Sequence, residues 1–165
     1  MTSASSHGIA VITGASSGIG AVYADRLARR GHDLILIARY RERLDALAHR
    51  LAEETGRAVD VVPADLSHKP DLVRVEEMLR TNAGITVLVN NAGIAMSGDL
   101  ASADPDRLES MIQLNVLAPS RLALAAIPGF LARGRGTLIK SAQSSPSRRR
   151  GSTAATAVRR RTCST

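Results

Sequence analysis

The chain alternates short, continuous apolar runs with longer segments in which apolar residues recur at helical spacing. The short runs are rich in β-branched residues and lead into glycine or polar clusters, as buried strands lead into turns. They predict strands at residues 8–13, 33–38, 59–62, 87–89 and 137–139. The longer segments predict helices at residues 19–30, 41–54, 70–79 and 105–131, the last capped by Asp104 and bent or broken near residues 115–119. Strands that alternate with helices favour a parallel sheet, so we predict a doubly wound α/β domain of Rossmann type, incomplete, with about five strands.

The charge distribution divides the chain into a neutral body and a basic tail. Residues 1–139 hold 15 of the 22 Lys/Arg and all 15 Asp/Glu, whereas residues 140–165 hold seven basic residues and no acidic one. The tail therefore carries the whole net charge of +7. It is rich in Ser and Arg and has almost nothing to bury, which is typical of disorder. We predict a dinucleotide-binding domain over 1–139 and a disordered tail over 140–165.

Several other classes of protein do not fit this composition. A basic tail suits nucleic acid or an acidic protein, but the neutral body and the lack of a motif around the arginines argue against a specific nucleic-acid binder. Cys163 is the single cysteine, which fits a reducing cytosol. No apolar run approaches the roughly 20 residues of a membrane span, and residues 1–8 lack the features of a secretory signal. The four histidines share no metal-ligand spacing. We expect a cytoplasmic protein without a membrane segment or a metal.

The turn after the first predicted strand has the pattern of a dinucleotide-binding loop. It reads Thr13-Gly14-Ala15-Ser16-Ser17-Gly18-Ile19-Gly20. Glycine at position 14 can take a positive φ, and missing side chains at 18 and 20 let backbone approach a ligand and the neighbouring strand. The following helix points its free N–H groups at the loop, which suits a pyrophosphate. A tight turn of any α/β protein is the alternative, and the flanking strand and helix favour the nucleotide interpretation.

The residues after the second predicted strand indicate which cofactor binds. An acidic residue about 20 positions past the glycines would bond the ribose 2′-hydroxyl, whereas an arginine suits a 2′-phosphate. The chain has Arg39 there, 19 residues after Gly20, with Arg41 and Arg43 beyond it. We predict that Arg39 contacts the cofactor and that NADP is preferred to NAD. The alternative is a solvated charge at the start of a helix.

Further motifs complete the pattern of a known family. The glycine turn is G-x-x-x-G-x-G, Asp65-Leu66 follows the third predicted strand, Asn90-Asn91-Ala92-Gly93 follows the fourth, and Asn115 lies in the next helix. As a set these motifs cover most of residues 8–139 and resemble the short-chain dehydrogenase/reductase family. The resemblance implies an NADP(H)-dependent oxidoreductase acting on a small-molecule carbonyl/alcohol pair.

By that resemblance the cofactor is cradled by the glycine turn, with Asp65 and Leu66 bordering the adenine. The predicted cofactor residues are Thr13, Gly14, Ser16, Ser17, Gly18, Ile19, Gly20, Arg39, Asp65, Leu66, Asn90, Asn91, Ala92 and Gly93. From the residues alone, Asn90 and Asn91 are amides that can also pin neighbouring backbone where strands end. A purely structural role for one of them stays open.

The catalytic set implied by the resemblance is incomplete. The family uses a Ser, a Tyr-x-x-x-Lys pair and an Asn, and Asn115 matches the Asn. The other three would fall at positions 143, 156 and 160, where the chain has Gln143, Thr156 and Arg160. A threonine hydroxyl cannot replace a phenol as the acid near neutral pH. We predict that Asn115 is the one catalytic residue left and that the chain is inactive, with a non-catalytic nucleotide-binding module as the alternative.

The genetic code offers a reason for the missing residues. The family continues its fifth strand with Asn-Ile, which AAC ATC can encode, and deletion of one C leaves codons for Lys-Ser, as in Lys140-Ser141. In the shifted frame, codons for this tail can supply a serine, a tyrosine and a lysine at positions 143, 156 and 160. We therefore predict a truncated reductase with an out-of-frame tail. In that case the fifth strand is a sheet edge, and the helix that forms a subunit interface in the family loses its partner, so native oligomerisation is lost.

Overall fold

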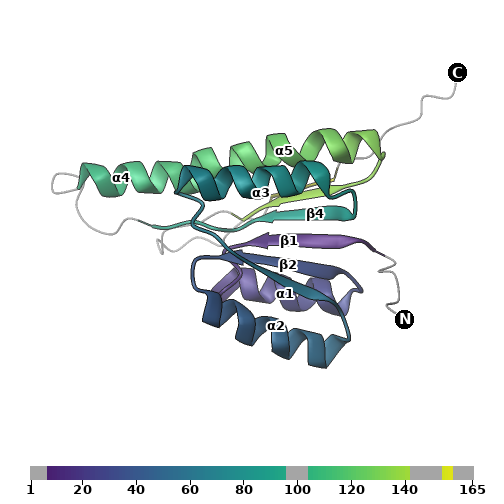
Figure 1. Ribbon diagram of the computed structural model, residues 1–165. Helices are drawn as coiled ribbons and strands as arrows, with labels where there is room; N and C mark the ends of the chain where they lie inside the picture. Colours follow the sequence, from purple (N-terminus) through teal and green to yellow (C-terminus); the bar gives the residue numbers. More distant parts are fainter. Residues whose placement is uncertain (1–6, 96–103, 142–153, 158–165) are drawn as a thin grey trace, which may run out of the picture.

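A parallel sheet with helices on both faces organises the chain, as the computed structural model shows for residues 7–95, 104–141 and 154–157 (Figure 1). The strand order is β3-β2-β1-β4-β5-β6. The strands are β1 (Ile9–Thr13), β2 (Asp33–Ala38), β3 (Val59–Pro63), β4 (Ile85–Asn90), β5 (Thr137–Lys140) and β6 (Ala154–Ala157). The first five run parallel to one another, which confirms the predicted Rossmann-type fold.

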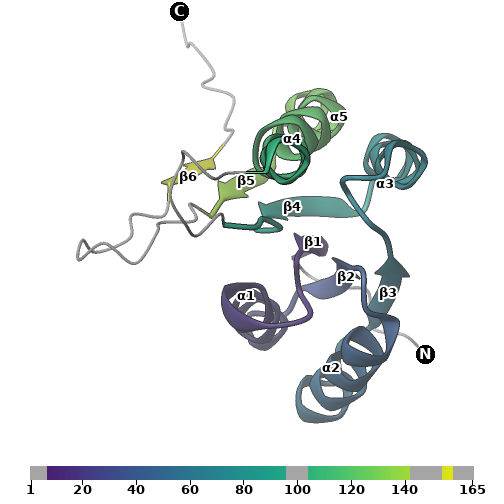
Figure 2. The same ribbon diagram turned by 90° about the vertical axis from the view of Figure 1, so that its left-hand side faces the viewer.

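The helices fall into two layers, one on each face of the sheet. They are α1 (Gly18–Arg29), α2 (Arg41–Thr55), α3 (Lys69–Thr81), α4 (Pro105–Ile112), the π-helical turn η2 (Gln113–Leu117) and α5 (Ala118–Ala132). Figure 2 shows α1 and α2 below the sheet, with α3, α4 and α5 above it. The chain builds outward from β1 to β3 and then returns to the other side of β1 with β4. At this reversal the loops after β1 and β4 diverge, which opens a crevice at the carboxyl ends of the strands.

Strands β1, β2 and β4 are buried on both faces, which explains their continuous apolar runs. Alternate side chains enter two separate cores. Val11 and Ile37 pack under α3 and α5, whereas Ile12 and Leu36 pack over α1 and α2. The cores are almost wholly aliphatic, and Phe130 of α5 is the one large aromatic side chain fully buried in the described part of the chain. Close packing of branched side chains therefore takes the place of aromatic bulk.

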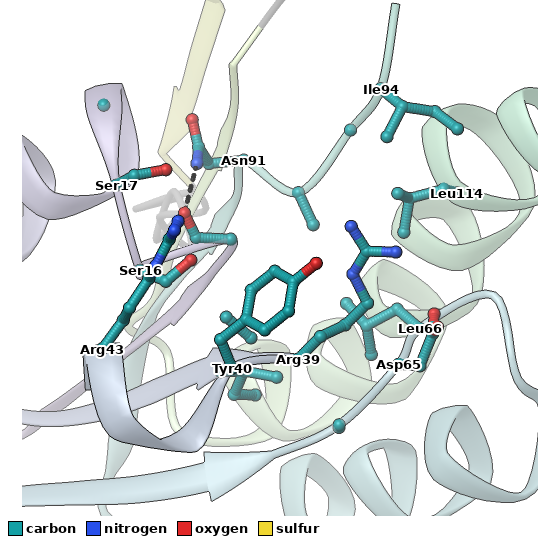
Figure 3. Close-up of a pocket in the computed structure, with 17 residues that line it drawn as sticks. Ser16, Ser17, Arg39, Tyr40, Arg43, Asp65, Leu66, Asn91, Ile94 and Leu114 are labelled. Carbon is teal, nitrogen blue, oxygen red and sulfur yellow. Dashed lines mark hydrogen bonds between the residues drawn. The ribbon is translucent and has the colours of Figure 1, made fainter. Parts of the chain in front are cut away.

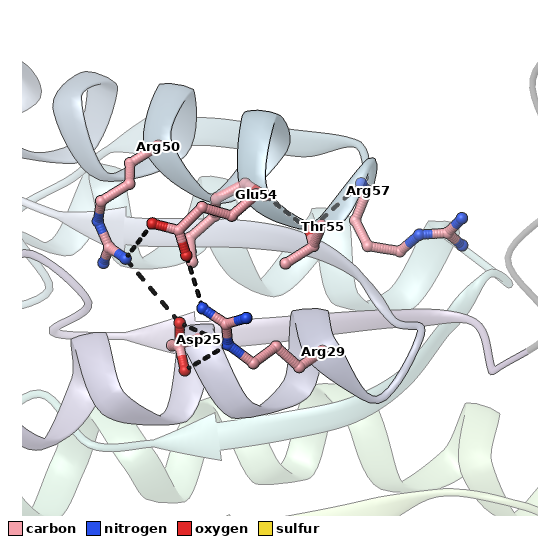
Figure 4. Close-up of polar contacts among 7 residues, drawn as sticks. Asp25, Arg29, Arg50, Glu54, Thr55 and Arg57 are labelled. Atoms are coloured by element: carbon pink, nitrogen blue, oxygen red, sulfur yellow. Dashed lines mark hydrogen bonds and ion pairs between the residues drawn. The ribbon is translucent and has the colours of Figure 1, made fainter.

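Exposed ion pairs connect α1 to α2 on the lower layer (Figure 4). Arg29 contacts Glu54 at 2.6 Å and Asp25 at 3.2 Å, and Arg50 contacts Glu54 at 3.3 Å. Pairs this exposed contribute about 0–1 kcal/mol each. Of these three pairs only Arg29–Glu54 joins the two helices, whose buried aliphatic side chains pack in one shared core.

The helix predicted at 105–131 is continuous, so of the two predicted alternatives, a bend or a break, the break is wrong. Asp104 caps it by accepting the N–H of Asp106 at 3.0 Å. The irregularity predicted near residues 115–119 is found at 113–117 as η2, which widens the helix by one residue without ending it. The resulting helical span, Pro105–Ala132, has the length and apolar composition of a membrane-crossing helix. Core helices of soluble proteins can have the same length and composition. Here α5 buries Leu122 and Phe130 against α3 and the sheet.

The edge of the sheet also differs from the prediction. Residues 154–157 form β6, which pairs antiparallel with β5, from Thr137 opposite Ala157 to Lys140 opposite Ala154. Within the described residues β5 is therefore not an edge strand, and the disorder predicted for the tail as a whole stays a prediction. An unpaired strand offers N–H and C=O groups that any extended segment can bond, with little demand on side chains. Positions 143 and 160 lie outside the described residues.

Candidate cofactor site

The carboxyl ends of the central strands open into a pocket of about 320 Å³. It lies at the crevice where the strand order reverses, between the turn after β1 and the segment after β4 (Figure 3). Ten of the fourteen predicted cofactor residues line it: Gly14, Ser16, Ser17, Gly18, Arg39, Asp65, Leu66, Asn91, Ala92 and Gly93. Motifs from four separate segments of the chain therefore meet at one cavity.

The glycine turn is shaped by contact with the end of β4. Gly14 has a φ of +66°, and a Cβ there would lie 2.8 Å from the Cα of Ala92. A Cβ on Gly20 would lie 2.2 Å from the carbonyl oxygen of Gly14 and 2.6 Å from Nδ2 of Asn91. Gly20 does not line the pocket. Its role is in packing, because the missing side chain lets α1 begin directly against the turn.

Thr13 and Asn91 tie this turn to β4 through a buried hydrogen-bond network. The Thr13 hydroxyl accepts the N–H groups of Asn91 and Ala92, each at 3.0 Å, and donates to the Val89 carbonyl at 3.3 Å. The Asn91 amide donates to the carbonyls of Thr13 and Gly14 at 3.2 Å. These bonds satisfy backbone groups that would otherwise be buried without partners, and they hold the pocket wall in place.

The neighbouring residue, Asn90, makes contacts that stabilise the fold. It is buried, and its Nδ2 donates to the Pro119 carbonyl at 3.0 Å, which connects β4 to α5. It does not line the pocket, and neither do Thr13 and Ile19. Ile19 lies in the first turn of α1 with 57% of its surface exposed. Direct cofactor contacts by these residues stay predictions.

Asn115 lies in the middle of η2, where its side chain is fully engaged. Its Oδ1 accepts the N–H of Ile94 at 2.9 Å and its Nδ2 donates to the Ile94 carbonyl at 2.7 Å, so it fixes the segment that follows Gly93. Its main-chain carbonyl is free of the usual helical partner, because Pro119 has no N–H to donate. Nζ of Lys140 donates to that carbonyl at 3.1 Å, and partial burial lowers the pKa of Lys140. The predicted catalytic role of Asn115 remains a prediction.

Asp65 and Leu66 follow β3 at the far side of the pocket. Leu66 is buried against the upper core and Asp65 holds a tight turn by accepting the N–H of Ser67 at 3.0 Å. The N–H of Asp65 donates to the carboxylate of Asp71 at 3.0 Å, and this hydrogen bond holds the pKa of Asp71 below its usual range. The loop is thus anchored to the first turn of α3, which presents Leu66 to the cavity.

Sequence reasoning missed seven lining residues. They are Ile37, Ala38, Tyr40, Arg43, Ala64, Ile94 and Leu114. Tyr40 places its ring between two cations, 5.5 Å from the Arg39 guanidinium and 5.3 Å from that of Arg43. The sequence shows several arginines after β2, which indicates a cationic site. Which of these arginines face the cavity is decided by the helical turn at the start of α2.

Comparisons with known proteins agree with this architecture. Residues 8–153 match the model of the short chain dehydrogenase family, and the chain belongs to this family. It is 36% identical over 135 residues to the very-long-chain 3-oxoacyl-CoA reductase of Anas platyrhynchos, covering 79% of this chain and 43% of that protein. The matched range of the family model ends before positions 156 and 160.

Solved structures show the same relationship. A short-chain dehydrogenase of Sphingobium yanoikuyae in complex with NADPH is 50% identical, with a TM-score of 0.79 over 81% of this chain and 52% of that one. A bulky-bulky ketone specific alcohol dehydrogenase of Comamonas testosteroni is 46% identical, with a TM-score of 0.79 over 81% and 53%. The chain thus spans about half the length of the relatives that it matches.

Proposed function

We propose that this chain binds NADP(H) in the pocket at the ends of β1, β2 and β4, and that it is the cofactor-binding part of an oxidoreductase acting on a carbonyl/alcohol pair. The observation that carries the proposal is the pocket itself, where the glycine turn, the cationic end of β2 and the Asp65-Leu66 loop meet. The NADPH complex of the 50% identical relative supports the choice of cofactor. Bound NADP(H) would supply the hydride, while these residues bind and orient it.

We further propose that the chain by itself does not turn over substrate. The family's acid is a tyrosine, and the last tyrosine of this chain is Tyr40. The main-chain carbonyl of Asn115 accepts a hydrogen bond from the side chain of Lys140. In the family pattern, the position of Lys140 is taken by an Asn. A tail translated out of frame from Lys140 onward accounts for both departures. On this proposal the protein keeps a nucleotide site and has lost its proton chemistry.

Binding and turnover test the two parts of the proposal separately. Fluorescence titration of the purified 165-residue chain with NADPH should give saturable binding, and assays with a generic ketone should give no NADPH consumption above background. A chain that binds no NADPH contradicts the cofactor assignment. Turnover that disappears in an Asn115→Leu variant contradicts the proposed inactivity and leaves the cofactor site standing.

The nucleotide sequence across codons 136–166 tests the frame proposal directly. The alternative frame should encode a serine, a tyrosine and a lysine at positions 143, 156 and 160 and should remain open. A stop codon in that frame before position 160 contradicts it. Restoring the frame should give a longer chain that reduces ketones with NADPH. The inactive control is the same longer chain with phenylalanine encoded at position 156 in place of the restored tyrosine.

A further inference from the structure

The last residue of β5 is a lysine that lines a second cavity, apart from the cofactor pocket. This cavity has a volume of about 370 Å³ and lies where β4 and β5 end under η2 and α5. Its apolar walls are Val116, Pro119, Ala123 and Leu138, and no residue that lines it also lines the cofactor pocket. Lys140 is therefore placed in an apolar setting of its own.

The amine of Lys140 is held by a neutral acceptor. Its Nζ donates to the main-chain carbonyl of Asn115 at 3.1 Å, a carbonyl that Pro119 leaves without its usual helical donor. Within the described part of the chain Lys140 contacts no carboxylate, and residues 140–165 contain no Asp or Glu. Partial burial without an opposing charge lowers the pKa of this amine, while the side chain stays accessible to solvent.

A second polar group at this end of the cavity also lacks a partner. Asn90 lies opposite Lys140 in the parallel pairing of β4 with β5, so both side chains leave the sheet on the same face. Its Nδ2 donates to the Pro119 carbonyl, whereas its buried Oδ1 makes no hydrogen bond within the described residues. The cavity thus combines an amine without a counter-ion, an amide oxygen without a donor, and aliphatic walls.

We propose that Lys140 is a carbonyl-reactive site that takes small aliphatic aldehydes as imines. The reactive form of a lysine is the neutral amine, which an apolar pocket favours. Nζ attacks the carbonyl carbon and a C–N bond forms, while one amine proton passes to the carbonyl oxygen to give a carbinolamine. Its hydroxyl is a donor of the kind that Oδ1 of Asn90 lacks. Loss of this hydroxyl with a second amine proton, as water, leaves the imine, so neither an oxidant nor a reductant is consumed.

Reductive trapping on the full chain tests this proposal, because the chain has only two lysines. Butanal with sodium cyanoborohydride converts an imine into a stable butylamine, and peptide mass spectrometry measures the label at Lys140 and at the exposed Lys69, which is the internal control. At pH 7 the initial labelling rate of Lys140 should exceed that of Lys69 about five-fold or more. This excess should fall as the pH rises to about 10, where an ordinary lysine also loses its proton.

Two variants test the setting and the nucleophile separately. Val116→Glu adds a carboxylate to the lining of the cavity and should bring the labelling rate of Lys140 at pH 7 to within about two-fold of the Lys69 rate. Lys140→Arg keeps the charge but removes the amine, so label at position 140 should be lost while NADPH affinity stays within about two-fold.

Two results overturn the proposal. The first is an equal labelling rate of Lys140 and Lys69 in the wild-type chain from pH 7 to 10, which shows an ordinary surface amine. The second is a larger excess at Lys140 with glyoxylate than with butanal, because the cavity then selects an anion and not an aliphatic body. Both results leave the cofactor pocket untouched, since the proposal does not rest on the proposed function.

Discussion

The two halves of this sheet differ in how completely their helices bury apolar side chains. From β1 to α3, every strand pairs with a parallel neighbour and the helices bury their apolar faces on the sheet. From α4 to β6, one face of the long helix stays open to solvent. Its exposed apolar side chains include Ile112 at 50%, Val116 at 58% and Leu124 at 72%. The second half thus has an apolar face without a partner among the described residues.

This contrast shows which half of the sheet forms the pocket that we propose binds NADP(H). The pocket draws almost all of its lining from β1–α3 and from the turn after β4. Only Leu114 comes from the long helix, and Asn115 supports the wall from behind. We expect the site to depend strongly on packing inside the first half and weakly on the open face of the second.

The largest effect is expected at Gly20, where helix α1 meets the turn. Gly20→Ala places a methyl group 2.2 Å from the Gly14 carbonyl oxygen, so backbone must move. We expect the free energy of unfolding to fall by about 3 kcal/mol and NADPH binding to be lost. Urea denaturation and NADPH titration measure the two effects. Gly18→Ala is the control, because a Cβ there meets nothing within 4 Å and only the positive φ opposes it, at about 1–2 kcal/mol. Equal losses in the two variants contradict the close-approach argument.

A smaller effect is expected at the buried carboxylate that connects the two upper helices. Glu76 of α3 is 3% exposed and accepts hydrogen bonds from Arg121 of α5, one of them at 3.0 Å, and from Arg80 at 3.2 Å. Glu76→Gln should lower the free energy of unfolding by about 2 kcal/mol, since both arginines lose their charged acceptor. Glu77→Gln, the exposed neighbour that contacts Arg80 at 3.6 Å, should cost less than about 0.5 kcal/mol. Similar costs for the two variants contradict a specific role of Glu76.

The same carboxylate predicts a pH dependence with a definite sign. Hydrogen bonds from Arg121 hold the pKa of Glu76 below its ordinary value of 4.5. Its folded-state pKa is therefore lower than its unfolded-state pKa, and its contribution is fully present above about pH 4.5 and is lost as the pH falls through the folded-state pKa. The difference in stability between wild type and Glu76→Gln should be constant from about pH 7 to 5 and shrink below about pH 4.5. Denaturation curves across this range measure it, and a difference that grows on acidification has the wrong sign.

The smallest effect on stability is expected on the open face of α5. Leu124 is 72% exposed, so Leu124→Lys should change the free energy of unfolding by less than about 0.5 kcal/mol. It should, however, reduce nonspecific aggregation at high protein concentration, because it interrupts an exposed apolar surface. Size-exclusion chromatography of wild type should show no compact dimer, in line with the predicted loss of native oligomerisation. Leu122→Ala, two residues away and fully buried, should cost about 2–5 kcal/mol and is the matched contrast. A stable wild-type dimer that Leu124→Lys dissociates contradicts the view that this face has no partner.

Local patterns in the sequence were sufficient for much of the fold. The run of residues 33–38 predicted β2 with its bounds, because a strand buried on both faces must be apolar throughout. The positive φ predicted for Gly14 is confirmed by its value of +66°, and Gly18, for which the sequence predicted close backbone approach, also takes a positive φ. The antiparallel pairing of β6 was not predictable, since backbone hydrogen bonding at a free strand leaves little trace in the side chains.

Spatial relations among the site residues were less accessible from the sequence. Residue spacing selected Arg39 as the cation at the end of β2, while the helical turn at the start of α2 brings Arg43 to the same pocket and turns Arg41 away. Asn115 was placed in the catalytic set by the family pattern, and the structure shows its amide committed to Ile94. Which donor meets which acceptor depends on how the elements pack, and spacing along the chain carries no such information.

The sequence by itself determined the order of strands and helices, the glycine turn and the absence of a tyrosine–lysine pair, because these follow from local periodicity and from residue identity. Only the tertiary structure decided that Thr13 and Asn91 join segments 78 positions apart, that two arginines converge on one pocket, and that one face of the long helix stays open. The physical reason is that such contacts depend on the packing of distant segments, whose relative positions are set by the buried cores on both faces of the sheet.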